Sequence, residues 1–444
     1  MFNLDFTHDS QRTSWVDSAN EHADFPIQNL PFGVYQTEGG SPQIGIAIGD
    51  QILNAQSVVT AGLVSDDATA DALTKANLTE VMSLSKSQRI ALRHELSNIL
   101  ASDSDVDQSK LTLVRQADAK MLMPCQIRDY TDFYASIYHA TNVGSMFRPN
   151  NPILPNYRHI PIGYHGRASS IIPSGEPLRR PVGQKAPAEE GHSSTRSPSA
   201  LLDYEFEVGF FVAEGNELGS TIPIENVEEK IFGMVLVNDW SARDLQKWEY
   251  QPLGPFLAKS FATTIAQWVV TMEALAPFRC AEFSRPEGDP TPLDYLDSEQ
   301  NRKSGGVNIQ LEAFLTSAKM REQSVDPFRL SKTTFTNMYW TIAQMLTHHS
   351  SNGCNMQPGD LLASGTVSGP GRDERGCLLE LTWNGDRDNP LPGSDRTPLK
   401  LPTEEERKFL ADGDEVILKG YCESESHRRI GFGVCSGVVL ESNG

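Results

Sequence analysis

The stretch from Asp203 to Thr264 constrains what this chain can fold into. It opens with acidic and apolar residues in alternation, Asp203-Tyr204-Glu205-Phe206-Glu207-Val208, and a period of two is typical of a β-strand. In such a strand the three acids share one face and the apolar residues share the other. Strands disfavour acidic residues, and carboxylates on one face repel each other. We therefore expect a positive partner for the acidic face.

A second apolar run, residues 231–237, predicts a buried strand that ends at Asn238-Asp239-Trp240. Arg243, Gln246 and Lys259 follow within a short span. A pair of carboxylates, a third acid at a strand end and two cations together indicate a metal site. The cations, Arg243 and Lys259, would line it as electrophilic groups.

The metal interpretation has a simpler alternative. The pair Glu205 and Glu207 by itself is better explained as the acidic face of an edge strand. Asp132 and Asp239 shift the balance toward a metal, because both stand beside aromatic residues, where an uncompensated acid is costly. Four carboxylates are hard oxygen ligands, which favour Ca²⁺ or Mg²⁺ over zinc.

The two cations also have an alternative partner set. Arg243 and Lys259 can form surface ion pairs with Asp244 and Glu249, and such pairs are common and weak. From the sequence alone this alternative has about the same weight as a role in the site.

A second cluster covers residues 129–148 and contains His139. Taken alone, His139 is best explained as a packed helix residue. Its closeness to Asp132 and Tyr134 raises the chance that it acts as a base. The glycine-rich loop 364–371 could cradle an anion, but no Gly-Lys-Ser/Thr follows it, which argues against a nucleotide site.

Composition excludes several classes of function. The 444-residue chain has a net charge of −20 and a pI near 4.9, which argues against binding to nucleic acid or to anionic membranes. No apolar run approaches the roughly 20 residues that a membrane span needs, and the N-terminus lacks the features of a signal peptide. The six cysteines show no CxxC spacing and indicate reduced thiols, hence a cytoplasmic protein.

The order of the predicted elements indicates a mostly β protein with some α. We expect a small β-rich domain over residues 1–120, with its first 24 residues loosely held, and a large domain over residues 121–444. The expected strands are 33–35, 43–48, 51–53, 203–212, 231–237, 307–314, 378–383, 416–418 and 430–440. The expected helices are 80–100 and 335–349, and residues 183–199 are expected to form a mobile surface loop.

Five segments together resemble the fumarylacetoacetate hydrolase family. They are Asp129-Tyr130-Thr131-Asp132-Phe133-Tyr134, His139-Ala140-Thr141-Asn142-Val143-Gly144, Tyr164-His165-Gly166-Arg167-Ala168-Ser169-Ser170, Asn238-Asp239-Trp240-Ser241-Ala242-Arg243-Asp244 and Gly365-Thr366-Val367-Ser368-Gly369. The similarity runs from about Asp24 to Val439. Departures are the first 24 residues, a longer loop around 384–404, and Ala258 where glycine is expected.

The resemblance implies a homodimer in which each chain has an N-terminal SH3-like barrel and a C-terminal mixed β-roll. It implies hydrolysis of the carbon–carbon bond of 4-fumarylacetoacetate to fumarate and acetoacetate, the last step of tyrosine and phenylalanine breakdown. A water molecule activated by a His–Glu pair would attack a carbonyl group beside the metal.

The resemblance also assigns roles to residues of this chain. The implied metal ligands are Asp132, Glu205, Glu207 and Asp239, with Lys259 and Thr263 at a neighbouring Mg²⁺ site. The implied substrate contacts are Tyr134, Arg148, Tyr164, Arg243, Gln246 and Thr366. His139 is the implied base and Glu380 its orienting partner, while Arg243, Gln246 and Lys259 complete the catalytic set.

Two alternatives remain open at this point. A related member of the family could act on another 1,3-diketone or decarboxylate an oxo-acid, although the extra N-terminal domain and Arg148 favour a fumaryl substrate. A non-catalytic homologue is the other alternative, and the presence of His139, Glu380 and all four acids argues against it.

Overall fold

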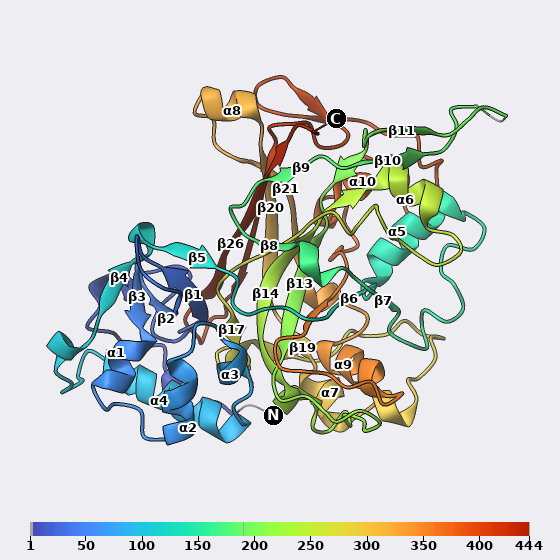
Figure 1. Ribbon diagram of the computed structural model, residues 1–444. Helices are drawn as coiled ribbons and strands as arrows, with labels where there is room; N and C mark the ends of the chain where they lie inside the picture. Colours follow the sequence, from blue (N-terminus) through green and yellow to red (C-terminus); the bar gives the residue numbers. More distant parts are fainter. Residues whose placement is uncertain (1–2, 190, 444) are drawn as a thin grey trace.

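The computed structural model describes residues 3–189 and 191–443 of the chain. Figure 1 shows a small N-terminal lobe, drawn in blue, beside a larger lobe built around long central strands. The expected class, mostly β with some α, is confirmed.

The small lobe is an antiparallel sheet of five strands in the order β4-β3-β2-β1-β5. Its strands are β1 (Phe32–Gln36), β2 (Gln43–Ile48), β3 (Gln51–Asn54), β4 (Leu113–Arg115) and β5 (Lys120–Leu122), and its helices are α1 (Ala55–Thr60), α2 (Asp67–Leu73), α3 (Thr79–Met82) and α4 (Lys86–Leu100). The expected tight turn between β2 and β3 holds Gly49 at φ +57°, a conformation that favours glycine. The division of the chain after residue 120 stays a prediction.

The larger lobe contains a mixed sheet in which β7-β6-β22-β13-β14-β16-β8 are neighbours and β17 also pairs with β14. These strands are β6 (Tyr130–Phe133), β7 (Gly163–His165), β8 (Ile171–Pro173), β13 (Phe206–Val212), β14 (Ile231–Asp239), β16 (Thr263–Ile265), β17 (Val270–Thr271) and β22 (Leu361–Ala363). We call it the central sheet. Its pairs β6–β22 and β8–β16 are parallel and the others are antiparallel.

A second, five-stranded sheet has the order β21-β20-β25-β26-β9. Its strands are β9 (Leu178–Arg179), β20 (Gln310–Thr316), β21 (Phe328–Thr334), β25 (Glu415–Cys422) and β26 (Ile430–Leu440). The remaining helices of the described residues are α5 (Ile137–Phe147), α6 (Arg243–Glu249), α7 (Glu299–Ser304), α8 (Ala318–Glu322), α9 (Ile342–Ser350) and α10 (Leu378–Leu381).

The two faces of β13 belong to different cores. Phe206, Val208 and Phe210 pack in the core that also holds apolar residues of β20 and β25. Phe211, on the other face, packs in the core of the small lobe. Because side chains alternate along a strand, Glu207 lies on the same face of β13 as Phe211. The small lobe covers that face at Phe211.

Both predicted helices are shorter than expected. The range 80–100 forms two helices, α3 and α4, because Ser85 caps α4 through a reciprocal pair of hydrogen bonds with Gln88. The range 335–349 begins with a 3₁₀ turn, and α9 starts only after Thr341, which forms the same kind of cap.

The strand expected over 378–383 is wrong, because Leu378–Leu381 form the short helix α10. The Asp203 side chain accepts hydrogen bonds from the backbone N–H groups of Leu378 and Leu379, which are then not available to a strand ladder. The strand expected from Asp203 is also interrupted: β12 (Leu202–Asp203) ends before Tyr204, and β13 begins at Phe206.

The N-terminal segment is anchored rather than loosely held over the residues that are described. The buried Arg93 guanidinium donates to Thr7 Oγ1 at 2.9 Å, and His8 Nε2 lies 2.9 Å from the carbonyl oxygen of Glu273. Residues 1 and 2 lie outside the described part of the chain.

The 183–199 segment, for which a mobile surface loop is expected, contains a hairpin of two antiparallel strands. The strands are β10 (Val182–Lys185) and β11 (Thr195–Pro198). Residue 190 of this segment lies outside the described residues.

Contact between the lobes can be tested at Phe232, which is 1% exposed and has its ring centroid 6.2 Å from that of Phe32. We expect Phe232→Ala to lower the free energy of unfolding by about 3–5 kcal/mol, because truncation leaves a cavity in the shared core. Urea denaturation followed by fluorescence measures the change. Leu218→Ala, at a side chain that is 79% exposed, is the control and should change stability by less than about 0.5 kcal/mol. A similar small change for Phe232→Ala would contradict the packing argument.

Candidate active site

Three carboxylates meet on one face of the central sheet. Asp132 lies in β6, Glu207 in β13, and Asp239 at the end of β14. One oxygen of each lies within 4.8 Å of an oxygen of the others. The pairing of β13 with β14 and of β22 with both β13 and β6 brings these distant sequence segments together.

Burial leaves this three-acid cluster short of hydrogen-bond donors. Glu207 is 0% exposed, and neither of its oxygens has a hydrogen-bonding partner. Asp132 Oδ1 is likewise buried without a partner. Burial, reinforced by the neighbouring carboxylates, raises the pKa of Asp132 and Glu207 well above the ordinary value and also raises the pKa of Asp239. Such buried, unpaired oxygens are suited to a hard divalent cation, so the residues fit a Ca²⁺ or Mg²⁺ ion.

Glu205 has a different environment from the three-acid cluster. Its Oε2 lies 2.7 Å from Lys259 Nζ, and its Oε1 lies 2.5 Å from Arg243 Nη1 and accepts a hydrogen bond from Ser241. Burial acts to raise the pKa of Glu205, but Lys259 and Arg243 outweigh it and hold that pKa below its ordinary value. Glu205 is therefore ionised and paired with two cations. These cations are the positive partners that the sequence pattern predicts for the acidic face.

Lys259 joins the two groups of acids. Its Nζ contacts Asp239 Oδ2 as well as Glu205, and Thr263 Oγ1 donates to Asp239 Oδ1 at 2.9 Å. Burial acts to lower the pKa of Lys259, but Asp239 and Glu205 raise it above its ordinary value. The ammonium group therefore stays charged at neutral pH.

The alternative pairs of Arg243 and Lys259 with Asp244 and Glu249 are not formed. Asp244 accepts from Ser199 Oγ and lies 3.4 Å from Lys185 Nζ. The Glu249 carboxylate accepts backbone N–H groups of Phe256 and Ala258, so the departure at Ala258 lies in a turn tied to the end of α6.

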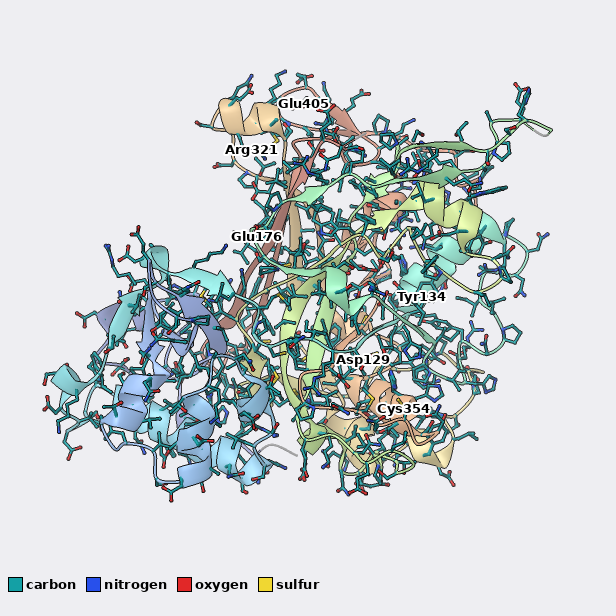
Figure 2. The ribbon with its side chains drawn as sticks, viewed as in Figure 1. Asp129, Tyr134, Glu176, Arg321, Cys354 and Glu405 are labelled. Carbon is teal, nitrogen blue, oxygen red and sulfur yellow. The ribbon has the colours of Figure 1, made fainter. Side chains whose placement is uncertain are left out.

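His139 and Glu380 form a fully buried pair, with Nδ1 2.6 Å from Oε2. Burial acts to raise the pKa of Glu380, but His139 and hydrogen bonds lower it to about 2, so the carboxylate accepts the Nδ1 proton. Nε2 is then the nitrogen that can take up a proton. The Tyr134 ring packs edge-on against this imidazole, with centroids 5.3 Å apart; Tyr134 is labelled in the larger lobe in Figure 2.

Other side chains fix the Glu380 carboxylate. Asn142 donates to Oε1 at 2.8 Å, and Ser368 and Cys377 contact Oε2 at 2.8 and 3.2 Å. His139, Cys377 and Glu380 also have ligand-type atoms within 4.8 Å of one another. Hydrogen bonds already use these atoms of Cys377 and Glu380, so we interpret the group as an acid–base unit and not as a metal site.

The residues with implied substrate roles lie at several positions around these groups. Tyr164 Oη is 3.4 Å from Asp239 Oδ2, and Gln246 Oε1 accepts a hydrogen bond from Arg243 Nη1 at 3.2 Å. Arg148, the residue after α5, donates to the Pro152 carbonyl at 3.3 Å, while its buried Nε has no hydrogen-bonding partner.

Thr366 reaches its buried position through the glycine-rich loop. A Cβ at Gly365, which has φ +76°, would lie 2.2 Å from the Phe133 carbonyl oxygen, so only glycine permits this close approach. The Thr366 hydroxyl is buried without a hydrogen-bonding partner. It is therefore a group that a ligand could satisfy.

Comparisons with known proteins identify the family of the chain. A family model described as "Fumarylacetoacetate (FAA) hydrolase C-terminal" matches residues 129–439, and one described as "Fumarylacetoacetase N-terminal" matches residues 28–124. The chain belongs to the fumarylacetoacetate hydrolase family. As a member of this family the protein is a hydrolase.

Relatives in the family match this chain along nearly its whole length. Fumarylacetoacetase of Bos taurus is 48% identical over 430 residues, covering 95% of this chain and 97% of that protein. Fumarylacetoacetase of Caenorhabditis elegans is 48% identical over 438 residues, covering 96% and 99%. A solved fumarylacetoacetate hydrolase from Exiguobacterium antarcticum has a TM-score of 0.50 at 15% identity, covering 93% of this chain and 99% of that one, and supports the fold.

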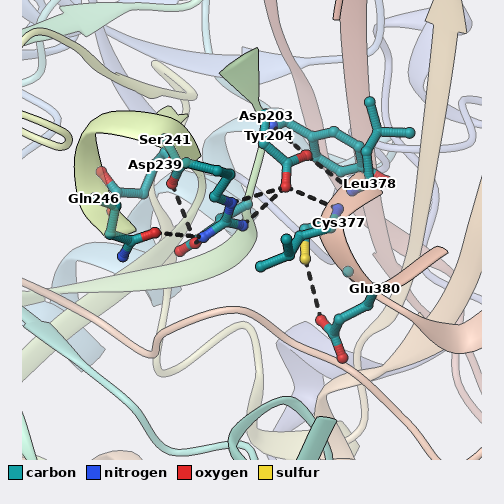
Figure 3. A network of polar contacts seen from close by, with 12 residues as sticks. Asp203, Tyr204, Asp239, Ser241, Gln246, Cys377, Leu378 and Glu380 are labelled. Carbon is teal, nitrogen blue, oxygen red and sulfur yellow. Dashed lines mark hydrogen bonds and ion pairs between the residues drawn. The ribbon is translucent and has the colours of Figure 1, made fainter. Parts of the chain in front are cut away.

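Sequence reasoning gave no role to three residues that hold the site in place: Asn142, Ser368 and Cys377 bind Glu380. It grouped Asp203 with the acidic face, and Asp203 binds Arg243. The spacing of His139 and Asn142 gave a usable signal, because residues three apart lie on the same face of a helix. No comparable local signal relates Ser368 or Cys377 to Glu380. Figure 3 shows Cys377 and Glu380 beside the Asp203 network.

The three-acid cluster leads to a prediction for Glu207→Gln. With metal removed by a chelator, we expect the variant to be at least as stable as wild type. A neutral amide then replaces a carboxyl group, and burial opposes the charge of that carboxyl group. The rise in melting temperature on adding Ca²⁺ or Mg²⁺ should shrink, because a ligand is lost. Differential scanning calorimetry with and without the ions measures both effects. Glu217→Gln, in an exposed loop, is the control; a wild-type response in Glu207→Gln would exclude Glu207 as a ligand.

Proposed function

We propose that this protein hydrolyses a carbon–carbon bond of 4-fumarylacetoacetate, giving fumarate and acetoacetate, as the last step of tyrosine and phenylalanine breakdown. The observation that carries the proposal is the buried His139–Glu380 pair in a site that also contains the three-acid cluster and two buried cations. The relatives that match nearly the whole chain are named fumarylacetoacetase, which supports the same substrate.

The proposed metal is Ca²⁺ or Mg²⁺. Asp132, Glu207 and Asp239 would hold it together with Glu205, which would have to share its oxygens with Lys259 and Arg243. When bound, a divalent cation acts as a Lewis acid that polarises the oxygens of a 1,3-diketone. Lys259 and Thr263, both in contact with Asp239, would border a neighbouring Mg²⁺ site.

His139 is the proposed general base. Its Nε2 takes a proton from water, whose oxygen attacks the carbonyl carbon at the fumaryl end, while Glu380 holds the imidazole through Nδ1. The bond from this carbon to the neighbouring methylene carbon then breaks. Its electron pair leaves as the enolate of acetoacetate, which is protonated to give the product.

Arg243, Lys259 and Gln246 are proposed to face the negative charge that develops on oxygen during attack and cleavage. The pKa of Arg243 lies above its ordinary value, because Glu205 and Asp203 outweigh the effect of burial, so this cation persists at neutral pH. Fixed, buried cations stabilise such charge strongly, because they do not need to reorganise. Tyr134, Arg148, Tyr164 and Thr366 are the proposed contacts to the rest of the substrate.

An assay of purified protein tests the function. Loss of the diketone absorbance of fumarylacetoacetate, with fumarate and acetoacetate identified by NMR, should depend on Ca²⁺ or Mg²⁺ and stop on chelation. His139→Ala should lower kcat roughly 10²–10⁴-fold, the usual contribution of general acid–base catalysis. Glu380→Gln should lower kcat less, and the double variant should be little worse than His139→Ala, because the two residues act as one unit.

Calorimetric titration with the metal is the control for these variants, since neither His139 nor Glu380 is a proposed ligand. Wild-type kcat in metal-loaded His139→Ala would refute the base assignment. Turnover of an oxo-acid or another diketone, without turnover of fumarylacetoacetate, would refute the substrate.

We also propose a cytoplasmic homodimer. None of the six cysteines forms a disulfide, in agreement with a reducing compartment. Among the residues described, no helix has the length and apolar character of a membrane span.

An apolar patch supports the dimer. The segment that follows α6 exposes Leu253 by 95% and Phe256 by 68%, and the Tyr250 ring lies 6.0 Å from that of Phe147 at the end of α5. Trp248 and Leu257 extend this exposed apolar surface. Such patches mark interaction sites, and we assign this one to a second copy of the chain.

Leu253→Glu tests the dimer. Sedimentation velocity of wild type should give about twice the chain mass of 49.0 kDa, and the variant should give the monomer mass, because a charge would be buried in the interface. Leu293→Glu, at a side chain that is 70% exposed outside the patch, should stay dimeric. An unchanged dimer in Leu253→Glu would remove the patch from the interface.

A further inference from the structure

Asp203 is a fully buried carboxylate beside the proposed site, with 0% of its surface exposed. Its Oδ2 accepts a hydrogen bond from Arg243 Nε at 3.0 Å and lies 2.9 Å from Arg243 Nη2. The same carboxylate accepts the backbone N–H of Leu378 at 2.8 Å and of Leu379 at 2.9 Å. Figure 3 shows these contacts converging on one side chain.

Besides the backbone N–H of its neighbour Tyr204, which it accepts at 2.9 Å, Asp203 has partners in two separate parts of the site. Arg243 begins α6 and carries its guanidinium to Glu205 and Gln246. The residues Leu378 and Leu379 begin α10, which carries Glu380 to His139. One carboxylate therefore connects the part of the site that holds the Arg243 cation with the part that holds the His139–Glu380 pair.

We propose that Asp203 is a positioning residue that fixes Arg243 relative to the His139–Glu380 pair. The inference rests on the proposed function, in which both groups act on one substrate. A shift of about 1 Å in a reacting group can reduce the rate about 100-fold, so a rigid connection between the two sides has a direct kinetic effect.

The chemistry of Asp203 explains why the carboxylate is required. All its partners are N–H donors, so both oxygens must accept. In Asp203→Asn the amide N–H₂ would replace either Oδ2, where it would face the donors of Arg243 and Leu379, or Oδ1, where it would face the backbone N–H groups of Leu378 and Tyr204. The variant keeps the size of the side chain, but either orientation breaks one of the two hydrogen bonds that join Asp203 to α10.

Asp414 provides a matched control for the loss of a buried carboxylate. It too is 0% exposed, and it is paired with Arg407 at 2.8 and 3.0 Å and accepts the backbone N–H of Ala411 at 2.8 Å. Its hydrogen-bonding partners are outside the proposed site. Asp414→Asn should therefore reproduce the general loss of stability without the specific effect on the site.

The experiment compares Asp203→Asn, Asp414→Asn and wild type by kinetics and proton NMR. The hydrogen-bonded Nδ1–H proton of His139 should resonate far downfield, and its loss in His139→Ala assigns it. We expect Asp203→Asn to shift or broaden this resonance and to lower kcat roughly 10–100-fold, the usual effect of a partner one shell beyond the reacting groups. Asp414→Asn should leave both unchanged. A wild-type resonance and kcat in folded Asp203→Asn would overturn the proposal.

Arg243→Lys covers the case in which Asp203→Asn does not fold. It keeps the positive charge but cannot reproduce the contacts of the guanidinium with Asp203 and Glu205 together. The His139 resonance should then shift in Arg243→Lys, although this residue makes no hydrogen bond to His139 or Glu380, and an unchanged resonance would refute the connection. The NMR readout needs no substrate, so a wild-type protein inactive on fumarylacetoacetate would refute the proposed function while this test still decides the role of Asp203.

Discussion

The pairing of Glu205 with Lys259 and Arg243 is the interaction on which the site depends. Each of these groups is almost fully buried, and an isolated charge in such a place would be very unfavourable. Glu205 contacts both cations, Lys259 also contacts Asp239, and Arg243 also contacts Asp203. The charges are stable in the interior because each one has an opposite charge in contact with it.

The same electrostatic balance leaves the three-acid cluster incompletely compensated. Lys259 reaches Asp239, but the Glu207 carboxylate has no donor, and burial raises the pKa of all three acids. Removing the penalty of several adjacent buried carboxylates requires protons or a cation. This is why the arrangement fits a divalent ion, whereas the fully hydrogen-bonded Glu380 serves another purpose.

The fold holds the acids in fixed positions and adds an acid–base pair beside them. The central sheet brings the ends of β6, β13 and β14 together through its pairing with β22, and cores on both faces of β13 keep the strand rigid. Loops from later in the chain then complete the site: Gly365 passes against the Phe133 carbonyl, and α10 brings Glu380 to His139. The rigid sheet thus fixes the acids, and irregular segments add the acid–base pair.

The sequence by itself determined the β-rich class, the long strands β14 and β26, and the acids and cations near residues 203–264, because alternation and charge are local properties of a chain. It did not separate Glu205 from Glu207, although they are only two residues apart on a predicted face. Tertiary structure decided that difference: Glu205 meets Lys259 and Arg243, whereas Glu207 meets Asp132 and Asp239. It also made α10 a helix and made Asp203 the contact between Arg243 and α10. Asp203 is separated from Leu378 by 175 positions and from Leu379 by 176, and hydrogen bonds over such separations leave no periodic signal in the sequence.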